Sequence, residues 1–366
     1  SKVNLMIDGK PSSIAGGDIK YLLQSVPAAN IADIEVMTNP GAKYDPEGMA
    51  GIINIVLKEN KFAGLNGNVN TGGDSQGGSN LSGQVNYRTT TFNSFINLGM
   101  NNRKRISDGT SFRSMEFPAF TNILDKNSES KSGGPNLFVK TGFEYFIDPT
   151  QSLAVSTTLS NGDRTNNNDT YTLDTGPGEK KYYRYTNGKN DRNGYDINLN
   201  YDKKFKNPKQ KLTSFLRFSD GLNDGLNEYY NTDDGGKNYV ENDMAKNGQD
   251  GTSKSYNFKL DYTHPFNEDS KLEFGLSSKS TDRGDNQIAE IFDVSTKKYI
   301  ADRTFSNEFV YNETVHAAYI QYGGNLGFIG YNAGGRYEIV DMMSELKTSN
   351  ESFKNPYSSF YPSLSI

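Results

Sequence analysis

Residues 39–57 decide the fold, and they read Asn-Pro-Gly-Ala-Lys-Tyr-Asp-Pro-Glu-Gly-Met-Ala-Gly-Ile-Ile-Asn-Ile-Val-Leu. The first part of this stretch excludes a helix, because it is rich in proline and glycine: Pro40, Gly41, Pro46, Gly48 and Gly51. The second part, Ile52–Val56, is a β-branched run interrupted by Asn54, and such a run predicts a strand. We therefore expect a loop that leads directly into a strand.

The same stretch resembles the end of the plug domain of TonB-dependent outer-membrane receptors, in the form found in the Gram-negative Bacteroidota. The resemblance is carried by Asn39-Pro40, Lys43-Tyr44, Glu47-Gly48 and Gly51-Ile52-Ile53-Asn54-Ile55. Ala50-Gly51 stands where the family has Gly-Gly, and Lys58 fits the basic residue that leads into the barrel. The resemblance implies a structural plug–barrel junction made by Asn39, Pro40, Lys43, Tyr44, Glu47, Gly48, Gly51, Ile53 and Asn54.

The residues before this stretch read as a small mixed α/β unit. Val3–Ile7 alternates with period two and predicts a strand, and 34–38 predicts another. Between them, Asp18 can cap a short helix that Pro27 ends, with its apolar face made by Ile19, Leu22, Leu23 and Val26. We expect residues 1–60 to form the C-terminal half of a plug domain.

Composition favours a β-rich protein with a large polar, water-exposed surface. The chain has 366 residues, 34% of them hydrophobic, yet it contains 23 Tyr and 21 Phe. Strands with one apolar face and long polar connections have this composition, as do transmembrane barrels and secreted all-β proteins. Cysteine is absent and the net charge is −5, so the sequence offers no disulfide or thiolate metal site and no support for nucleic-acid binding.

From Phe62 onward, short segments alternate between apolar and polar residues with period two, which gives each strand one apolar and one polar face. Most of these segments reach the ~9–11 residues that a tilted strand needs to cross a bilayer. About twelve strands are expected, near 62–71, 80–89, 92–101, 135–147, 151–160, 193–205, 209–219, 253–266, 270–280, 309–323, 328–341 and 357–366.

The predicted connections alternate between short turns and long polar loops. The longest expected loops are 102–134, 161–192, 220–252 and 281–308, with shorter ones at 72–79 and 341–356. A barrel across the outer membrane has short periplasmic turns and long outside loops, whereas both ends of a sandwich face water. Aromatic residues near the short turns, such as Tyr87, Phe92, Tyr262 and Phe266, suit an aromatic girdle at the membrane boundary.

The fold we expect is therefore an all-β transmembrane antiparallel barrel preceded by a small α/β plug fragment. Residues 61–366 would form the N-terminal part of the barrel. The resemblance implies twenty-two strands for the full protein, and twelve would enclose a lumen too narrow for a folded plug. We therefore expect the chain to be an internal piece of a longer polypeptide.

The sequence supports no catalytic site, because neither His264 nor His316 has partners at metal-ligand or triad spacing. The acidic clusters 220–225 and 231–235 could offer oxygen ligands to calcium, but their spacing falls short of an EF-hand and solvated loops explain them better. A third set of charges is expected to face the plug across the lumen, with Lys43, Asp45 and Glu47 as counterparts: Lys140, Glu144, Asp196, Asp202, Lys259, Asp261, Arg336 and Glu338.

Three functions remain open at this point. The resemblance implies a TonB-dependent receptor in the outer membrane that imports a nutrient of unknown identity, with lipid, lipopolysaccharide and TonB as partners. A receptor-like barrel that no longer transports could serve as a structural subunit beside a surface lipoprotein or other outer-membrane proteins, because fold does not fix function. A secreted adhesin or glycan-binding protein is the third alternative.

Overall fold

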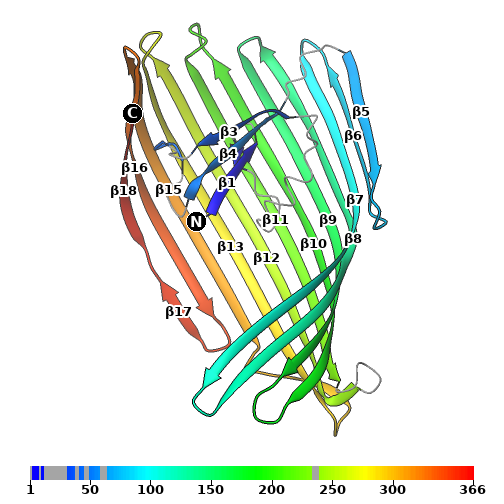
Figure 1. The fold of residues 1–366 in the computed structure, drawn as a ribbon. Helices are drawn as coiled ribbons and strands as arrows, with labels where there is room; N and C mark the ends of the chain where they lie inside the picture. Colours follow the sequence, from blue (N-terminus) through cyan, green and yellow to red (C-terminus); the bar gives the residue numbers. More distant parts are fainter. Residues whose placement is uncertain are drawn as a thin grey trace.

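The computed structural model describes residues 2–7, 10–11, 31–37, 41–44, 49–57, 64–232 and 239–366. These residues form two β-sheets, one of four strands and one of fourteen. The large sheet is a curved wall of long, tilted strands, and the small sheet lies against one face of it (Figure 1). We call the face that the small sheet contacts the inner face, and the opposite one the outer face.

The small sheet has the strand order β2-β1-β4-β3, formed by β1 (Lys2–Ile7), β2 (Lys10–Pro11), β3 (Ile31–Met37) and β4 (Met49–Leu57). The strands predicted before and within residues 39–57 are thus confirmed. Ile52 and Ile55 of the central strand β4 are fully buried, which explains its nearly continuous apolar run. The helix predicted at 18–26 lies outside the described residues.

The large sheet contains all twelve of the predicted strands. Along the chain they are β5 (Gly64–Gly73), β6 (Ser79–Arg88), β7 (Phe92–Phe117), β8 (Phe120–Asp148), β9 (Gln151–Asp174), β10 (Lys180–Lys204), β11 (Lys211–Thr232), β12 (Tyr239–Pro265), β13 (Lys271–Asp293), β15 (Asn307–Leu326), β16 (Ile329–Leu346) and β18 (Tyr357–Ser365). Two short strands complete it, β14 (Lys298–Ala301) beside β13 and β17 (Glu351–Lys354) beside β16. Within the described residues β5 pairs only with β6 and β18 only with β16, so the edges of the wall are not joined to each other.

The short connections lie together at one end of the wall, as the sequence predicted. Four of them are closed by a side chain that accepts a hydrogen bond from a backbone N–H two residues later, the interaction for which Asp, Asn and Thr favour turns. The acceptors are Thr89, Asp148, Asn207 and Asn267, at 2.7–3.1 Å from the amide nitrogens of Thr91, Thr150, Lys209 and Asp269.

The long connections differ from the prediction, because most of their residues are paired strand. The segment 102–134, expected to be a loop, is a hairpin in which β7 and β8 pair without a slip from Phe92–Tyr145 to Phe117–Phe120. The segments 161–192, 220–252 and 281–308 likewise continue β9 to β13, and β16 continues to Leu346. Beyond the apolar segments both faces of these strands are wet and polar, so the period-two signal disappears although the pairing continues.

The outer face carries an exposed apolar band beside the short turns. On β9, for example, Leu153, Val155 and Leu159 are 42–51% exposed, and Leu199 of β10 and Phe258 of β12 are also exposed rather than packed into a dry interior. At the short-turn end the band ends in aromatic rings that pack against one another. The ring centres of Tyr262 and Phe274 are 5.2 Å apart, and those of Phe266 and Tyr322 are 6.0 Å apart. An exposed apolar surface that ends in aromatic rings is typical of the lipid-facing side of a membrane barrel.

Beyond the band, the outer face carries a row of four aspartates on neighbouring strands. Asp163 is the register partner of Asp191, Asp191 of Asp224, and Asp224 of Asp250. Directly opposite residues have Cβ atoms only ~5 Å apart, so these like charges repel one another. We call this set the aspartate row.

Candidate functional site: the contact of the 41–44 turn with the inner wall

A tight turn brings residues 41–44 onto the inner face of the wall. The turn is closed by the Tyr44 N–H, which donates to the Gly41 carbonyl oxygen at 3.0 Å. A Cβ atom on Gly41 would lie 2.8 Å from Oε1 of Gln321 in β15. The glycine therefore lets the turn approach the wall closely.

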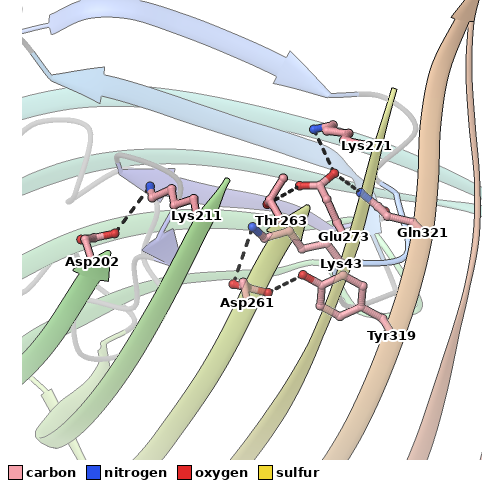
Figure 2. Close-up of polar contacts among 9 residues, drawn as sticks. All are labelled: Lys43, Asp202, Lys211, Asp261, Thr263, Lys271, Glu273, Tyr319 and Gln321. Atoms are coloured by element: carbon pink, nitrogen blue, oxygen red, sulfur yellow. Dashed lines mark hydrogen bonds and ion pairs between the residues drawn. The ribbon is translucent and has the colours of Figure 1, made fainter. Parts of the chain in front are cut away.

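Lys43 forms the ionic part of this contact. Its Nζ lies 3.6 Å from Oδ2 of Asp261 in β12, and the other carboxylate oxygen accepts a hydrogen bond from the Tyr319 hydroxyl at 2.5 Å (Figure 2). The side chains of Lys43 and Asp261 are 31% and 16% exposed, so the pair is only partly open to water. Lys43 and Asp261, which the sequence analysis expected to face each other, thus lie in contact.

A second carboxylate lies beside the first on the neighbouring strand. Glu273 of β13 accepts from Gln321 Nε2 at 2.8 Å, and the Lys271 ammonium lies 2.9 Å from the same oxygen. Its other oxygen accepts a longer bond, 3.4 Å, from the Thr263 hydroxyl (Figure 2). Three adjacent strands thus present a network of hydrogen-bonded charges to the 41–44 turn.

Tyr44 completes the contact from the side of the turn. Burial raises the pKa of its hydroxyl above the ordinary tyrosine value, and the carboxylates of Glu273, Asp261 and Glu35 raise this pKa further. The hydroxyl therefore stays protonated throughout the physiological range.

The other described junction residues stabilise the small sheet rather than touching the wall. Gly51 has φ of 149° at an irregularity in the pairing of β1 with β4, where Lys2 pairs with Met49 but Val3 with Gly51, and only glycine adopts that conformation without strain. Buried Asn54 donates to Glu35 of β3 at 2.7 Å, and the neighbouring Ile53 is half-buried. Asn39, Pro40, Glu47 and Gly48 lie outside the described residues, as does Asp45.

Most of the other charges predicted for the lumen also lie on the inner face. Asp196 pairs with Arg217 at 3.5 Å and Arg336 with Glu338 at 2.5 Å, and all four of these residues are buried. Asp202 pairs with Lys211 at 3.5 Å on the same face as the Lys43–Asp261 pair (Figure 2). Lys140, Glu144 and Lys259 share this face by strand alternation.

No metal or catalytic centre emerges from the described residues. Among them no group of three His, Asp or Glu side chains is arranged to hold a metal ion. The segment 220–225, weighed as a calcium loop, lies inside β11, and 231–235 is only partly described. His264 packs edge-on against Phe266 with ring centres 5.2 Å apart, in the outer aromatic cluster. None of the described residues forms a helix with the length and apolarity that crossing a membrane requires.

The sequence prediction missed Glu273, Tyr319 and Gln321. All three occupy inward positions of strands whose alternation was visible, so their direction could have been assigned. Their grouping around the plug turn depends on the register of β12, β13 and β15, which no local pattern encodes.

Comparison with known proteins identifies the wall. Residues 203–366 match the model of the outer membrane protein beta-barrel family, and this segment contains the wall residues that surround Lys43 and Tyr44. The protein is therefore an outer-membrane protein, and its large antiparallel sheet is a transmembrane β-barrel wall. No curated protein matches the chain in sequence.

Among solved structures, the chain is similar to the ferric citrate transporter FecA in its unliganded form, at 11% identity over 100% of this chain and 70% of that one, with a TM-score of 0.40. It is similar to the ferric yersiniabactin uptake receptor FyuA from Yersinia pestis, at 9% identity, 99% and 70% coverage and a TM-score of 0.39. It is also similar to the siderophore receptor PiuA from Acinetobacter baumannii, at 10% identity over 95% of this chain and 71% of that one, with a TM-score of 0.34. Likenesses of this degree assign no substrate to the chain.

Proposed function

We propose that this chain is part of a TonB-dependent outer-membrane receptor of the Bacteroidota type, with residues 1–60 as plug and 61–366 as barrel wall. It would import a nutrient through the barrel when TonB displaces the plug. The observation that carries the proposal is the seating of the 41–44 turn on the polar inner face of an outer-membrane wall, through the Lys43–Asp261 pair.

The geometry supports a plug that is held but can be released. The contact is polar and partly hydrated: one lysine, one tyrosine and a glycine turn meet two carboxylates and an amide. Partly exposed ion pairs exchange readily for water, unlike an apolar core, so such a plug can separate from the wall without unfolding it. In this function the site binds and gates, and it carries out no chemical reaction.

A tethering experiment tests the proposal. Residues 1–366 contain no cysteine, so Lys43→Cys with Asp261→Cys places the only two thiols of this segment at the contact. A short bismaleimide would then bind the plug to the wall. Mass spectrometry of the medium then measures which compounds cells carrying the protein take up. We expect at least one compound to be depleted from the medium. Its depletion should stop after cross-linking or after collapse of the proton gradient.

The matched control is the Lys43→Cys variant alone, treated with the same reagent, which should keep importing. A structural subunit would behave differently. If no compound is depleted in an energy-dependent way, and the protein co-purifies stably with other outer-membrane proteins, the transport proposal is wrong and the alternative of a non-transporting barrel is favoured.

A further inference from the structure

The hairpins beyond the apolar band carry a cluster of arginines on the inner face. Arg103 and Arg105 of β7, Arg164 of β9 and Arg192 of β10 are all exposed, and strand alternation places all four on the face that carries Asp261. The sequence prediction treated these segments as loops and therefore could not assign a direction to these side chains.

The strand register brings the four arginines together. Arg103 pairs with Gly134 and Arg105 with Ser132 of β8, and Ser132 pairs in turn with Asn166 of β9. Arg164 is the partner of Asn190, two residues from Arg192 on β10. Residues directly opposite on adjacent strands have Cβ atoms ~5 Å apart, and diagonal ones ~7–8 Å, so the arginines occupy one continuous patch over four strands.

The neighbours of the arginines are neutral. Arg192 donates through Nε to Asn190 Oδ1 at 2.9 Å and Asn223 Oδ1 at 3.0 Å, and the next partners along these rows are Gly225, Gly251 and Gln249. Among the described residues, the one inward-facing carboxylate at this height belongs to Asp285 of β13, and it accepts a hydrogen bond from Gln249 Nε2 at 3.0 Å. We call the four arginines with these amides and glycines the arginine belt.

The belt differs in charge balance from the rest of the inner wall. Nearer the short turns, inward charges occur in pairs, such as Arg217 with Asp196 and Arg336 with Glu338. In the described part of the chain, by contrast, no ion pair involves Arg103, Arg105 or Arg164. The aspartate row lies at the same height on the outer face of β9 to β12.

We infer that the arginine belt is the binding surface for an anionic solute that carries several carboxylate or phosphate groups. Arginine's planar fork matches either anion with two parallel hydrogen bonds, and amide donors beside it bind the remaining oxygens. The inner face beyond the membrane band is also where a solute must pass before reaching the plug. The inference rests on the proposed receptor function, and it adds the substrate class.

Calorimetry on the purified full-length protein tests it with two probes, tripolyphosphate and propane-1,2,3-tricarboxylate, at low salt. Binding of at least one probe is expected, and the probe bound more tightly identifies the oxyanion. The variant with Arg103→Gln, Arg105→Gln and Arg164→Gln should raise the Kd by about tenfold or more, because it removes three charge-assisted contacts. Lys104→Gln is the matched control, since Lys104 lies between two of these arginines on the outer face, and its Kd should stay within about twofold of the parent.

If neither probe binds the parent protein, or if the triple variant binds as tightly as Lys104→Gln, the belt is not an anion site. Circular dichroism of each variant shows whether the β-structure is intact, and single Arg→Gln variants replace any triple variant that fails to fold. Binding in detergent needs no energy source. If the protein imports a solute but binds neither probe, only this inference is wrong. If it binds a probe but shows no energy-dependent import, only the receptor proposal is wrong.

Discussion

The Lys43–Asp261 pair should contribute measurable coupling free energy between plug and wall. At 3.6 Å and an effective dielectric constant near 20, the attraction between the two charges is about 4–5 kcal/mol before desolvation. Partial exposure and desolvation reduce this value, since exposed pairs give ~0.2–1 kcal/mol and breaking buried ones costs ~3–5 kcal/mol. We expect a coupling of about 1.5 kcal/mol, in between these limits.

A double-mutant cycle of Lys43→Gln and Asp261→Asn measures this coupling. Each single change should cost about 2 kcal/mol, because Lys43→Gln leaves Asp261 and Glu273 without this lysine and Asp261→Asn also weakens the bond from Tyr319. The double variant should cost about 2.5 kcal/mol, well below the sum.

Release of the small sheet can be followed in urea through a spin label at Ile34→Cys, an exposed position on β3 in a chain without other thiols. The label reports the small sheet separately from the wall, so the cycle yields the free energy of plug release. A coupling below about 0.5 kcal/mol would mean that the pair does not hold the plug, and the reasoning from its burial would be refuted.

Three further outcomes are expected. Tyr319→Phe removes the donor to Asp261 and should lower the free energy of plug release by about 1.5–3 kcal/mol in the same urea assay, whereas an unchanged value would show that the bond is not formed. Glu268, in the turn after β12, has its pKa lowered by Lys209, whose ammonium lies 2.7 Å away, so the stabilisation from this pair is present above the unfolded-state pKa and lost as pH falls through the lower folded-state pKa. Carboxyl NMR should show Glu268 titrating below an ordinary glutamate and returning to that value in Lys209→Gln. Asp191→Asn removes a charge flanked by Asp163 and Asp224 and should raise stability by about 0.2–1 kcal/mol, more at low salt, and a loss of thermal stability would contradict the repulsion argument.

Local sequence patterns predicted the strands in contact with the membrane, because lipid on one side and water on the other impose period two. Tyr195–Tyr201 and Tyr256–Tyr262 show this alternation clearly, and both lie in strands where the sequence placed them. The short turns were equally predictable, since Asp148, Asn207 and Asn267 close them with their own side chains.

The same reasoning failed where both faces of a strand are solvated. The segment from Asn161 to Asn168 contains four asparagines and no apolar residue, yet it is paired on both sides in the sheet. Its backbone hydrogen bonds stabilise it without any help from apolar burial, so no hydrophobic period marks it. The plug contact was predicted in part: the alternation gave the direction of Asp261, whereas its neighbours Glu273 and Tyr319 depended on long-range register.

The unbroken register of β7 with β8 and of β9 with β10 limits how these hairpins can change length. Because side chains alternate with period two, one residue inserted into each strand near the membrane would keep the pairing but exchange the arginine belt with the aspartate row beyond it. Two residues inserted into each strand would keep every side chain on its original face, and this adds four residues to each hairpin. Viable insertions and deletions near the membrane should therefore come in multiples of four. Sequence variants of this protein should follow this rule even where their loop tips differ.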